Sequence, residues 1–164
     1  MANNVMILTT ADGIEIFHHP TESHSHRPDL DAEAVSRVSI DGRFFVCETV
    51  DFGRTIGFDH LVETTDSDEI VLYKRGDRPY ESRMVPDRKA EPTSRVTVII
   101  CKCGPEDGAG WDGKYVLITL FEGESGCPEP FGDDDTPENR AFWARHALVP
   151  TDEELADMKS NGLL

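Results

Sequence analysis

Two β-prone stretches decide the fold: RVTVIICKC at residues 95–103 and KYVLITLFEGE at residues 114–124. Each is rich in Val, Ile, Leu and Thr over about eight residues, and such side chains favour strands. The connection between them, residues 104–113, contains Pro and several glycines, which is typical of a loop. The two stretches therefore predict an antiparallel pair of strands joined by a long connection.

Upstream of this pair, the sequence twice suggests a β-hairpin. Apolar runs at residues 5–10 and 14–17 flank Ala11-Asp12-Gly13, and an Asp-Gly turn between two such runs indicates a hairpin. Residues 38–50 repeat this pattern around Asp41-Gly42. We therefore predict two N-terminal hairpins, followed by a further strand over about residues 69–75.

Helices are predicted near both ends of the chain. Residues 29–37 (DLDAEAVSR) predict a short helix. Thr136-Pro137-Glu138 combines an N-cap, a proline at the first helical position and an acid in the first turn, so a helix begins there and ends before Pro150. Thr151 opens a last helix, which Gly162 ends.

These elements predict the α+β class, with a mainly antiparallel central sheet, flanking and C-terminal helices and an N-terminal β-hairpin layer. Residues 1–56 would form the hairpin layer or subdomain, and residues 57–164 the α+β core. The two parts are expected either as separate units or as one continuous domain.

Composition narrows the class of protein. The chain has 164 residues, of which 38% are hydrophobic, enough for a compact core. No run approaches the roughly 18 to 20 apolar residues of a membrane span, and the N-terminus lacks the features of a secretory leader. The four cysteines are too few and too unevenly spaced for a disulfide framework, so we expect reduced thiols, a cytoplasmic location and no membrane partner.

Charge is unevenly distributed along the chain. Asp and Glu number 32 against 16 Lys and Arg, a net charge of −16 that opposes non-specific attraction to nucleic acid and favours a basic partner. Residues 74–102 nevertheless hold eight cations and four acids, whereas residues 122–164 hold eleven acids and three cations. The basic segment is therefore the place to look for an anionic ligand.

Metal and nucleotide motifs are not supported by the spacing. Cys101, Cys103, Cys127 and the histidines of residues 18–26 are zinc-type ligands, but alternate residues of one strand lack the knuckle of a Cys-x-x-Cys motif. We therefore expect free thiols and an exposed histidine loop. No phosphate-binding glycine motif and no Gly-x-Ser-x-Gly elbow occurs, so neither a metal nor a cofactor is predicted.

The basic segment also carries chemistry suited to RNA. His60 lies upstream of an arginine-rich strand and turn that contains Arg75, Arg78 and Arg83. Metal-independent RNA cleavage needs a group that takes the proton of the 2′-hydroxyl and cations that stabilise the phosphorane. A histidine and arginines supply both. Alternatively, His60 is a packed or surface histidine, and the arginines form a solvent-facing edge with neighbouring acids.

A resemblance points the same way. The run DHLVET…DEIVLYKRGDRPYESRMV…PTSRVTVII…YVLITLFEGE…PEP…FWARHALV, from about Gly57 to Val149, resembles bacterial toxin-type ribonucleases of the superfamily that contains barnase, EndoU and the colicin-type nucleases. The resemblance implies an antiparallel sheet bearing the active site, and metal-independent cleavage through a cyclic phosphate. It also implies an acid/base role for His60, phosphate-binding roles for Arg75 and Arg78, and a site hydroxyl on Thr119. Further candidates for substrate binding are Lys74, Arg83 and Arg95.

The alternative is an acidic binding protein. An immunity factor, toxin neutraliser or nucleic-acid mimic would use its carboxylates to cover a basic protein partner. The residues that would carry that contact are Glu122, Glu124, Glu129, Asp133, Asp134 and Asp135. The two hypotheses differ in the partner, RNA in the first and a basic protein in the second.

Overall fold

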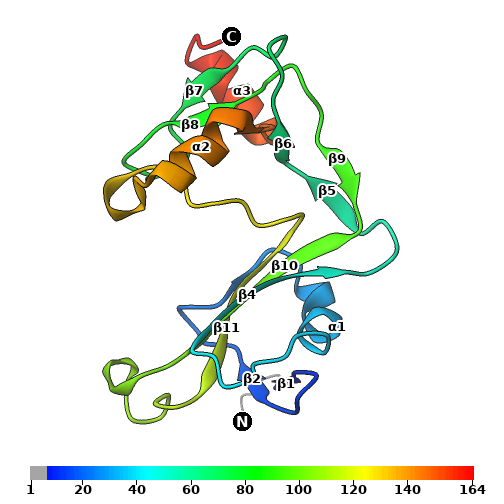
Figure 1. Cartoon of the computed structure of the whole chain (residues 1–164), viewed down its shortest axis with the longest axis vertical. Coiled ribbons are helices and arrows are strands. Elements are labelled where there is room, and N and C mark those ends of the chain that lie inside the picture. The colour runs from blue at the N-terminus through cyan, green and yellow to red at the C-terminus, as the bar shows by residue number, and fades with distance from the viewer. Residues whose placement is uncertain (1–6) are drawn as a thin grey trace. The chain divides into compact units, whose positions relative to one another are not determined.

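The chain folds into two compact units of the α+β class, each built from separate stretches of sequence. The structure is a computed structural model that describes residues 7–164 (Figure 1). Unit 1 comprises the described residues up to Gly57 and Thr93–Ser125, and unit 2 comprises Phe58–Pro92 and Gly126–Leu164. The chain thus crosses from one unit to the other three times, after Gly57, after Pro92 and after Ser125. The predicted boundary between residues 56 and 57 lies one residue before the first of these crossings. Strands β5 (Gly57–Asp59) and β9 (Glu91–Thr93) pair with each other at the first two passages.

Unit 1 is organised around the predicted central pair of strands. Its sheet has the order β1-β2-β11-β10-β4, and β10 pairs antiparallel with both β11 and β4. The antiparallel pair and its long connection are thereby confirmed. Strands β2 and β3 pair parallel with β11 along its other edge, so the sheet is mixed. The bounds are β1 Leu8–Thr9, β2 Glu15–Phe17, β3 His24–Ser25, β4 Phe45–Asp51, β10 Arg95–Lys102 and β11 Tyr115–Glu122.

Only one of the two predicted hairpins forms. The first is confirmed, because β1 and β2 pair antiparallel around the Asp12-Gly13 turn, although residues 5 and 6 of the predicted strand lie outside the described residues. The second was wrong, because residues 38–40 form no strand. The backbone N–H groups of Ile40 and Asp41 instead donate to the Asp12 carboxylate, each at 3.0 Å.

The Asp12 carboxylate makes the stability of the protein depend on pH in the acidic range. Hydrogen bonds from the N–H of Asp41, the Thr10 hydroxyl and the N–H of Ile40 lower the pKa of Asp12 from 3.8 to about 2. Because the folded pKa lies below the unfolded one, this contribution is present above pH 3.8 and is lost as the pH falls to about 2. We expect Asp12→Asn to be less stable than the wild type at neutral pH and equally stable at about pH 2. Urea unfolding at both pH values, with Asp112→Asn as the control, measures this; a difference that persists in acid would contradict it.

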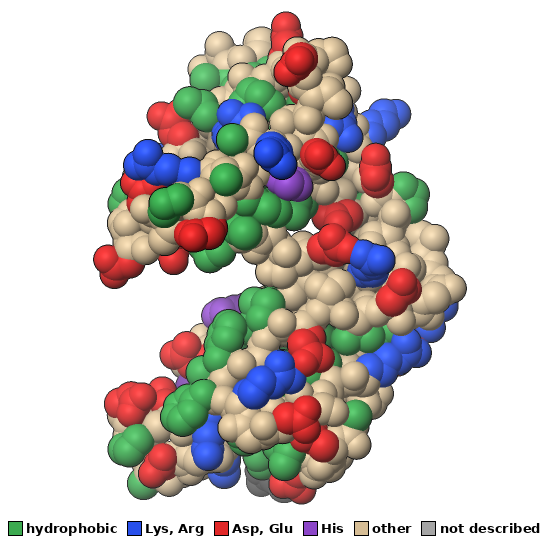
Figure 2. Space-filling view, viewed as in Figure 1, with side chains coloured by type: hydrophobic (Ala, Val, Ile, Leu, Met, Phe, Trp, Pro, Cys, Tyr) green, Lys and Arg blue, Asp and Glu red, His purple; other side chains and the backbone are tan. Residues whose placement is uncertain are grey.

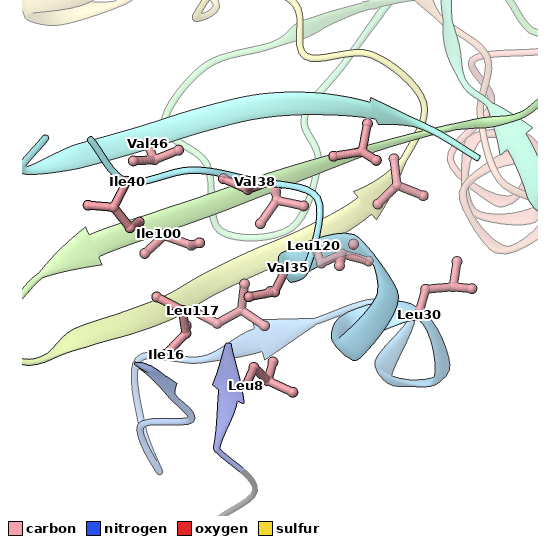
Figure 3. Close-up of a cluster of buried hydrophobic side chains, with 14 of the residues drawn as sticks. Leu8, Ile16, Leu30, Val35, Val38, Ile40, Val46, Ile100, Leu117 and Leu120 are labelled. Atoms are coloured by element: carbon pink, nitrogen blue, oxygen red, sulfur yellow. The ribbon is translucent and has the colours of Figure 1, made fainter. Parts of the chain in front are cut away.

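One face of the unit 1 sheet is covered by the predicted short helix. That helix is η1 (Pro28–Leu30) followed by α1 (Asp31–Val35), within the predicted range of residues 29–37 apart from Pro28. Figure 3 shows Val35 beside Leu117 and Leu120 of β11, with Ile100 of β10 in the same buried cluster. Val96, Val98 and Ile100, at alternate positions of β10, belong to the same cluster as Val35 of α1, so this core lies on the helix-covered face.

Unit 2 is a smaller sheet with the order β6-β12-β8-β7. Strands β6 (Leu61–Glu63) and β12 (His146–Leu148) are antiparallel, β12 and β8 (Ser82–Met84) are parallel, and β8 and β7 (Val71–Tyr73) are antiparallel. Strand β7 is shorter than the predicted strand over residues 69–75.

The two C-terminal helices begin where the sequence predicts. Thr136 caps α2 (Pro137–Arg145), its side chain accepting a hydrogen bond from the N–H of Asn139. Thr151 and Glu154 form a capping box at α3 (Asp152–Ser160). Met158 of α3 packs with Tyr73 and Met84 on one face of the sheet. Over residues 7–164, no helix is both long and apolar enough to cross a bilayer.

Candidate functional site

Unit 2 contains a pocket of about 270 Å³ between β8, residues 129–130 and α2. We call it the arginine pocket. Along β8 the side chains alternate, so Arg83 lies on the face opposite Met84 and therefore opposite α3. On the face of unit 2 that carries α2, charged side chains of both signs lie among hydrophobic ones (Figure 2). The polar and aromatic residues that line the pocket are Tyr80, Glu81, Arg83, Glu129, Arg140 and Trp143.

Trp143 holds one wall of the pocket in place. Its side chain is only 7% exposed, and its indole N–H donates to the carbonyl oxygens of Cys127 at 2.9 Å and Pro128 at 3.2 Å. An indole N–H that is buried needs such a partner. These two hydrogen bonds fix the backbone directly before Glu129, whose side chain is half-buried.

The two arginines of the pocket differ in their partners. Arg140 donates to Asp135 through Nε and also through Nη2, the latter at 2.7 Å, and this contact lowers the pKa of Asp135. Arg83 donates through Nε to the carbonyl oxygen of His146 at 3.3 Å. Within residues 7–164, its two terminal nitrogens have no hydrogen-bond partner. Arg83 can therefore present two N–H groups side by side to an anion, as carboxylate or phosphate recognition requires.

His60 is anchored two strands away from Arg83. Its Nδ1 lies 2.8 Å from the carbonyl oxygen of Val149, and the N–H of Val149 donates to the His60 carbonyl at 2.7 Å. A carbonyl only accepts, so we assign the proton to Nδ1, which leaves Nε2 for acid/base chemistry. Because His60 precedes β6 and Arg83 lies in β8, two strand spacings, or about 10 Å, separate their backbones.

Arg75, Arg78 and Lys74 follow β7, at the opposite edge of the sheet from β6. Three strand spacings, about 14 Å, therefore separate them from β6, the strand that follows His60. The structure does not bring these three residues together with His60. Arg75 donates through Nε to Glu154 of α3 at 2.7 Å. Burial favours a higher pKa for Glu154, but its hydrogen bonds with Arg75 and with the N–H of Thr151 outweigh burial and lower it. Lys74 and Arg78 are exposed.

Thr119 and Arg95 belong to unit 1. The Thr119 hydroxyl donates to the carbonyl oxygen of His24 at 2.9 Å. Arg95 pairs with Asp51 at 3.8 Å and with Glu124. Of the seven residues predicted for the ribonuclease site, Arg83 alone lines the arginine pocket. The roles of all seven stay predictions.

The acidic residues of the alternative hypothesis are also divided between the units. Glu122 pairs with Arg27 at 2.8 Å, and Glu124 pairs with Arg95, both in unit 1. In unit 2, Asp133 and Asp134 are exposed in the single turn η3 (Gly132–Asp134). Asp and Glu outnumber Lys and Arg two to one in each unit.

The cysteines and the histidine loop form no recognisable metal centre. All four cysteines are free, and within residues 7–164 no three His, Cys, Asp or Glu side chains are grouped in a way that could hold a metal ion. The histidine loop is anchored in unit 1. Asp31, fully buried, accepts from the Ser25 hydroxyl at 2.6 Å and lies 3.2 Å from Nε2 of His18, and burial raises the pKa of Asp31.

Sequence reasoning missed Tyr80, Glu81, Arg140 and Trp143 as members of the site, and it named Glu129 only for the acidic binding protein. One signal could have found Arg140 and Trp143: Arg140, Trp143 and Ala144 are spaced by three and four residues, which places them on one face of the predicted helix.

Comparisons of the chain with protein-family models, curated proteins and solved structures found no match.

Proposed function

We propose that the chain is a metal-independent ribonuclease of the toxin type and that the reacting phosphate binds in the arginine pocket. The observation that carries the proposal is the set of groups in this one pocket: two guanidinium groups, two carboxylates and two aromatic rings. Guanidinium groups bind phosphate, aromatic rings stack on bases, and carboxylates take up protons. A stretch of RNA offers a partner for each of them.

In the proposed reaction, the Glu129 carboxylate takes the proton of a 2′-hydroxyl. The 2′-oxygen attacks the adjacent phosphorus, the bond from phosphorus to the 5′-oxygen breaks, and a 2′,3′-cyclic phosphate forms. The leaving 5′-oxygen takes a proton from a general acid or from water. Arg83 and Arg140 stabilise the charge of the phosphorane. We assign the base role to Glu129 because it is half-buried beside the backbone fixed by Trp143, whereas Glu81 is exposed.

The decisive experiment is cleavage of total RNA by the purified chain in EDTA, with mass spectrometry of the new ends. We expect cyclic phosphate ends from the wild type and a rate lowered by about 100-fold or more in Glu129→Gln, the range of a lost general base. Glu81→Gln, which makes the same change in the exposed carboxylate of the pocket, is the matched variant and should retain cleavage. His60→Ala tests the acid/base role that the resemblance implies. The absence of cleavage by the wild type would sink the proposal. Loss of cleavage in His60→Ala alone would move the base role to His60.

Asp135 is expected to compete with RNA for Arg140. Its carboxylate occupies two N–H groups of the guanidinium that a phosphate would otherwise use. We expect Asp135→Asn to bind RNA about two- to fivefold more tightly, the modest effect of removing an exposed ion pair. Fluorescence anisotropy with a labelled oligoribonucleotide measures this. Asp133→Asn, which removes the same charge two residues earlier, is the control, and an equal effect of both variants would show that only net charge matters.

A binding role is the second candidate, and the acidity of both units favours it. In this role the chain is an immunity factor, toxin neutraliser or nucleic-acid mimic, and exposed carboxylates such as Asp133 and Asp134 contact a basic protein. Replacing both by Lys would then abolish capture of that partner. In this role neither the wild type nor the variant would cleave RNA. Cleavage of RNA by the wild type, lost in Glu129→Gln, would favour the enzyme instead.

A further inference from the structure

An aromatic pair stands beside the arginine pocket. The rings of Tyr80 and Phe131 are 5.3 Å apart between centroids and are inclined at 32°. Tyr80 lines the pocket, whereas Phe131 does not and is 46% exposed. Leu72, 53% exposed, is the cross-strand neighbour of Arg83 in β7. Exposed apolar side chains therefore lie next to two of the residues that line the pocket, Tyr80 and Arg83.

Packing within unit 2 does not account for these exposed side chains. Neither Phe131 nor Leu72 belongs to the two buried hydrophobic clusters of this unit. Grouped exposed apolar side chains mark binding sites more often than isolated ones do. Arg83 is the cross-strand neighbour of Leu72, and Arg78 lies two residues before Tyr80, so both can contact the phosphates of an anionic ligand with flat apolar faces, which is the chemistry of a nucleic acid strand.

We infer that Tyr80 and Phe131 form a stacking subsite for an unpaired base next to the phosphate held by Arg83 and Arg140, so that the substrate is single-stranded RNA. This inference rests on the proposed function and adds the class of substrate to it. In a duplex the faces of the bases are covered by their neighbours, whereas unpaired bases can stack on aromatic side chains. Exposed Arg78, in the same β7–β8 connection as Tyr80, lies where it can neutralise a neighbouring phosphate.

The test measures binding of an uncleavable probe, a labelled 2′-O-methyl oligoribonucleotide, either as a single strand or annealed to its complement. We expect the wild type to bind the single strand at least about tenfold more tightly than the duplex, and Phe131→Ala to bind the single strand about 5- to 100-fold more weakly, the range of one lost base–aromatic stack. Phe131→Leu keeps the apolar volume but removes the ring, so it should lose most of the same affinity. Phe44→Ala, which truncates a phenylalanine of unit 1 that is 70% exposed, is the matched control and should bind like the wild type.

Two results would overturn the inference. The first is equal affinity for single strand and duplex, and the second is a Phe131→Ala variant that binds the single strand like the wild type. Both leave the proposed ribonuclease standing if the wild type still cleaves RNA in EDTA. A wild type that neither binds nor cleaves RNA would instead end the proposed function, and this inference with it.

Discussion

Arg83→Ala should cleave RNA about 10²- to 10³-fold more slowly than the wild type, the usual cost of removing one preorganised donor from a site of charge development. Arg83 has the strongest claim to this role, because Nε is anchored on the His146 carbonyl and the two terminal nitrogens have no partner within the described residues. The measurement is the single-turnover rate on a labelled oligoribonucleotide in EDTA. Circular dichroism of the variant checks that the fold is retained.

Two further variants make this prediction specific. Arg145→Ala removes an exposed arginine at the end of α2 that does not line the pocket, and it should cleave at the wild-type rate. Arg83→Lys keeps the charge but loses the fork of N–H groups, so it should recover only part of the rate. If Arg83→Ala cleaves within about threefold of the wild type, far short of the loss of an active-site donor, the phosphate does not bind there.

Leu120→Ala should lower the free energy of unfolding of unit 1 by about 2 to 5 kcal/mol, because it leaves a cavity in a fully packed cluster. Leu120 is fully buried in β11, between β10 and β3. The chain has two tryptophans, Trp111 in unit 1 and Trp143 in unit 2, so the fluorescence of Trp111 in a Trp143→Phe background reports on unit 1. Urea unfolding in that background measures the change.

The control for this variant is Ile7→Ala, which truncates an isoleucine of unit 1 that is 49% exposed and should change stability by less than about 0.5 kcal/mol. A loss in Leu120→Ala as small as that of the control would mean that the Leu120 cluster is not a tightly packed core.

The parts of the fold that could be predicted are those in which local preference and burial agree. The strands over residues 95–102 and 115–122 consist largely of β-branched and apolar residues and lie in the centre of a sheet. The helix starts at Thr136 and Thr151 depend on side chains within three residues of the cap. The missing strand at residues 38–40 could not be predicted in this way, because the Asp12 carboxylate that accepts from the N–H of Ile40 lies 28 residues earlier.

The candidate site was harder to predict for the same physical reason. The sequence predicts Arg83 as a substrate-binding residue, and the structure places it in the pocket, but the helix that lines the same pocket begins more than fifty residues later. The sequence around Arg75 does not indicate that Arg75 will pair with Glu154, and the sequence around Thr119 does not indicate that its hydroxyl will donate to the His24 carbonyl. The partners of long polar side chains come from the tertiary arrangement, which local patterns do not encode.

The three passages of the chain between the units set an order for folding during synthesis. Unit 1 has all its strands once Glu122 has left the ribosome, even though residues 58–92 interrupt it. Unit 2 must wait, because β12 lies between β6 and β8, and neither of those strands has its central neighbour until residues 146–148 emerge. The arginine pocket needs α2 as well. A nascent chain therefore carries a complete unit 1 while the arginine pocket, the proposed site for RNA, is still unassembled, and any cleavage by that pocket must wait until residues 146–148 have emerged.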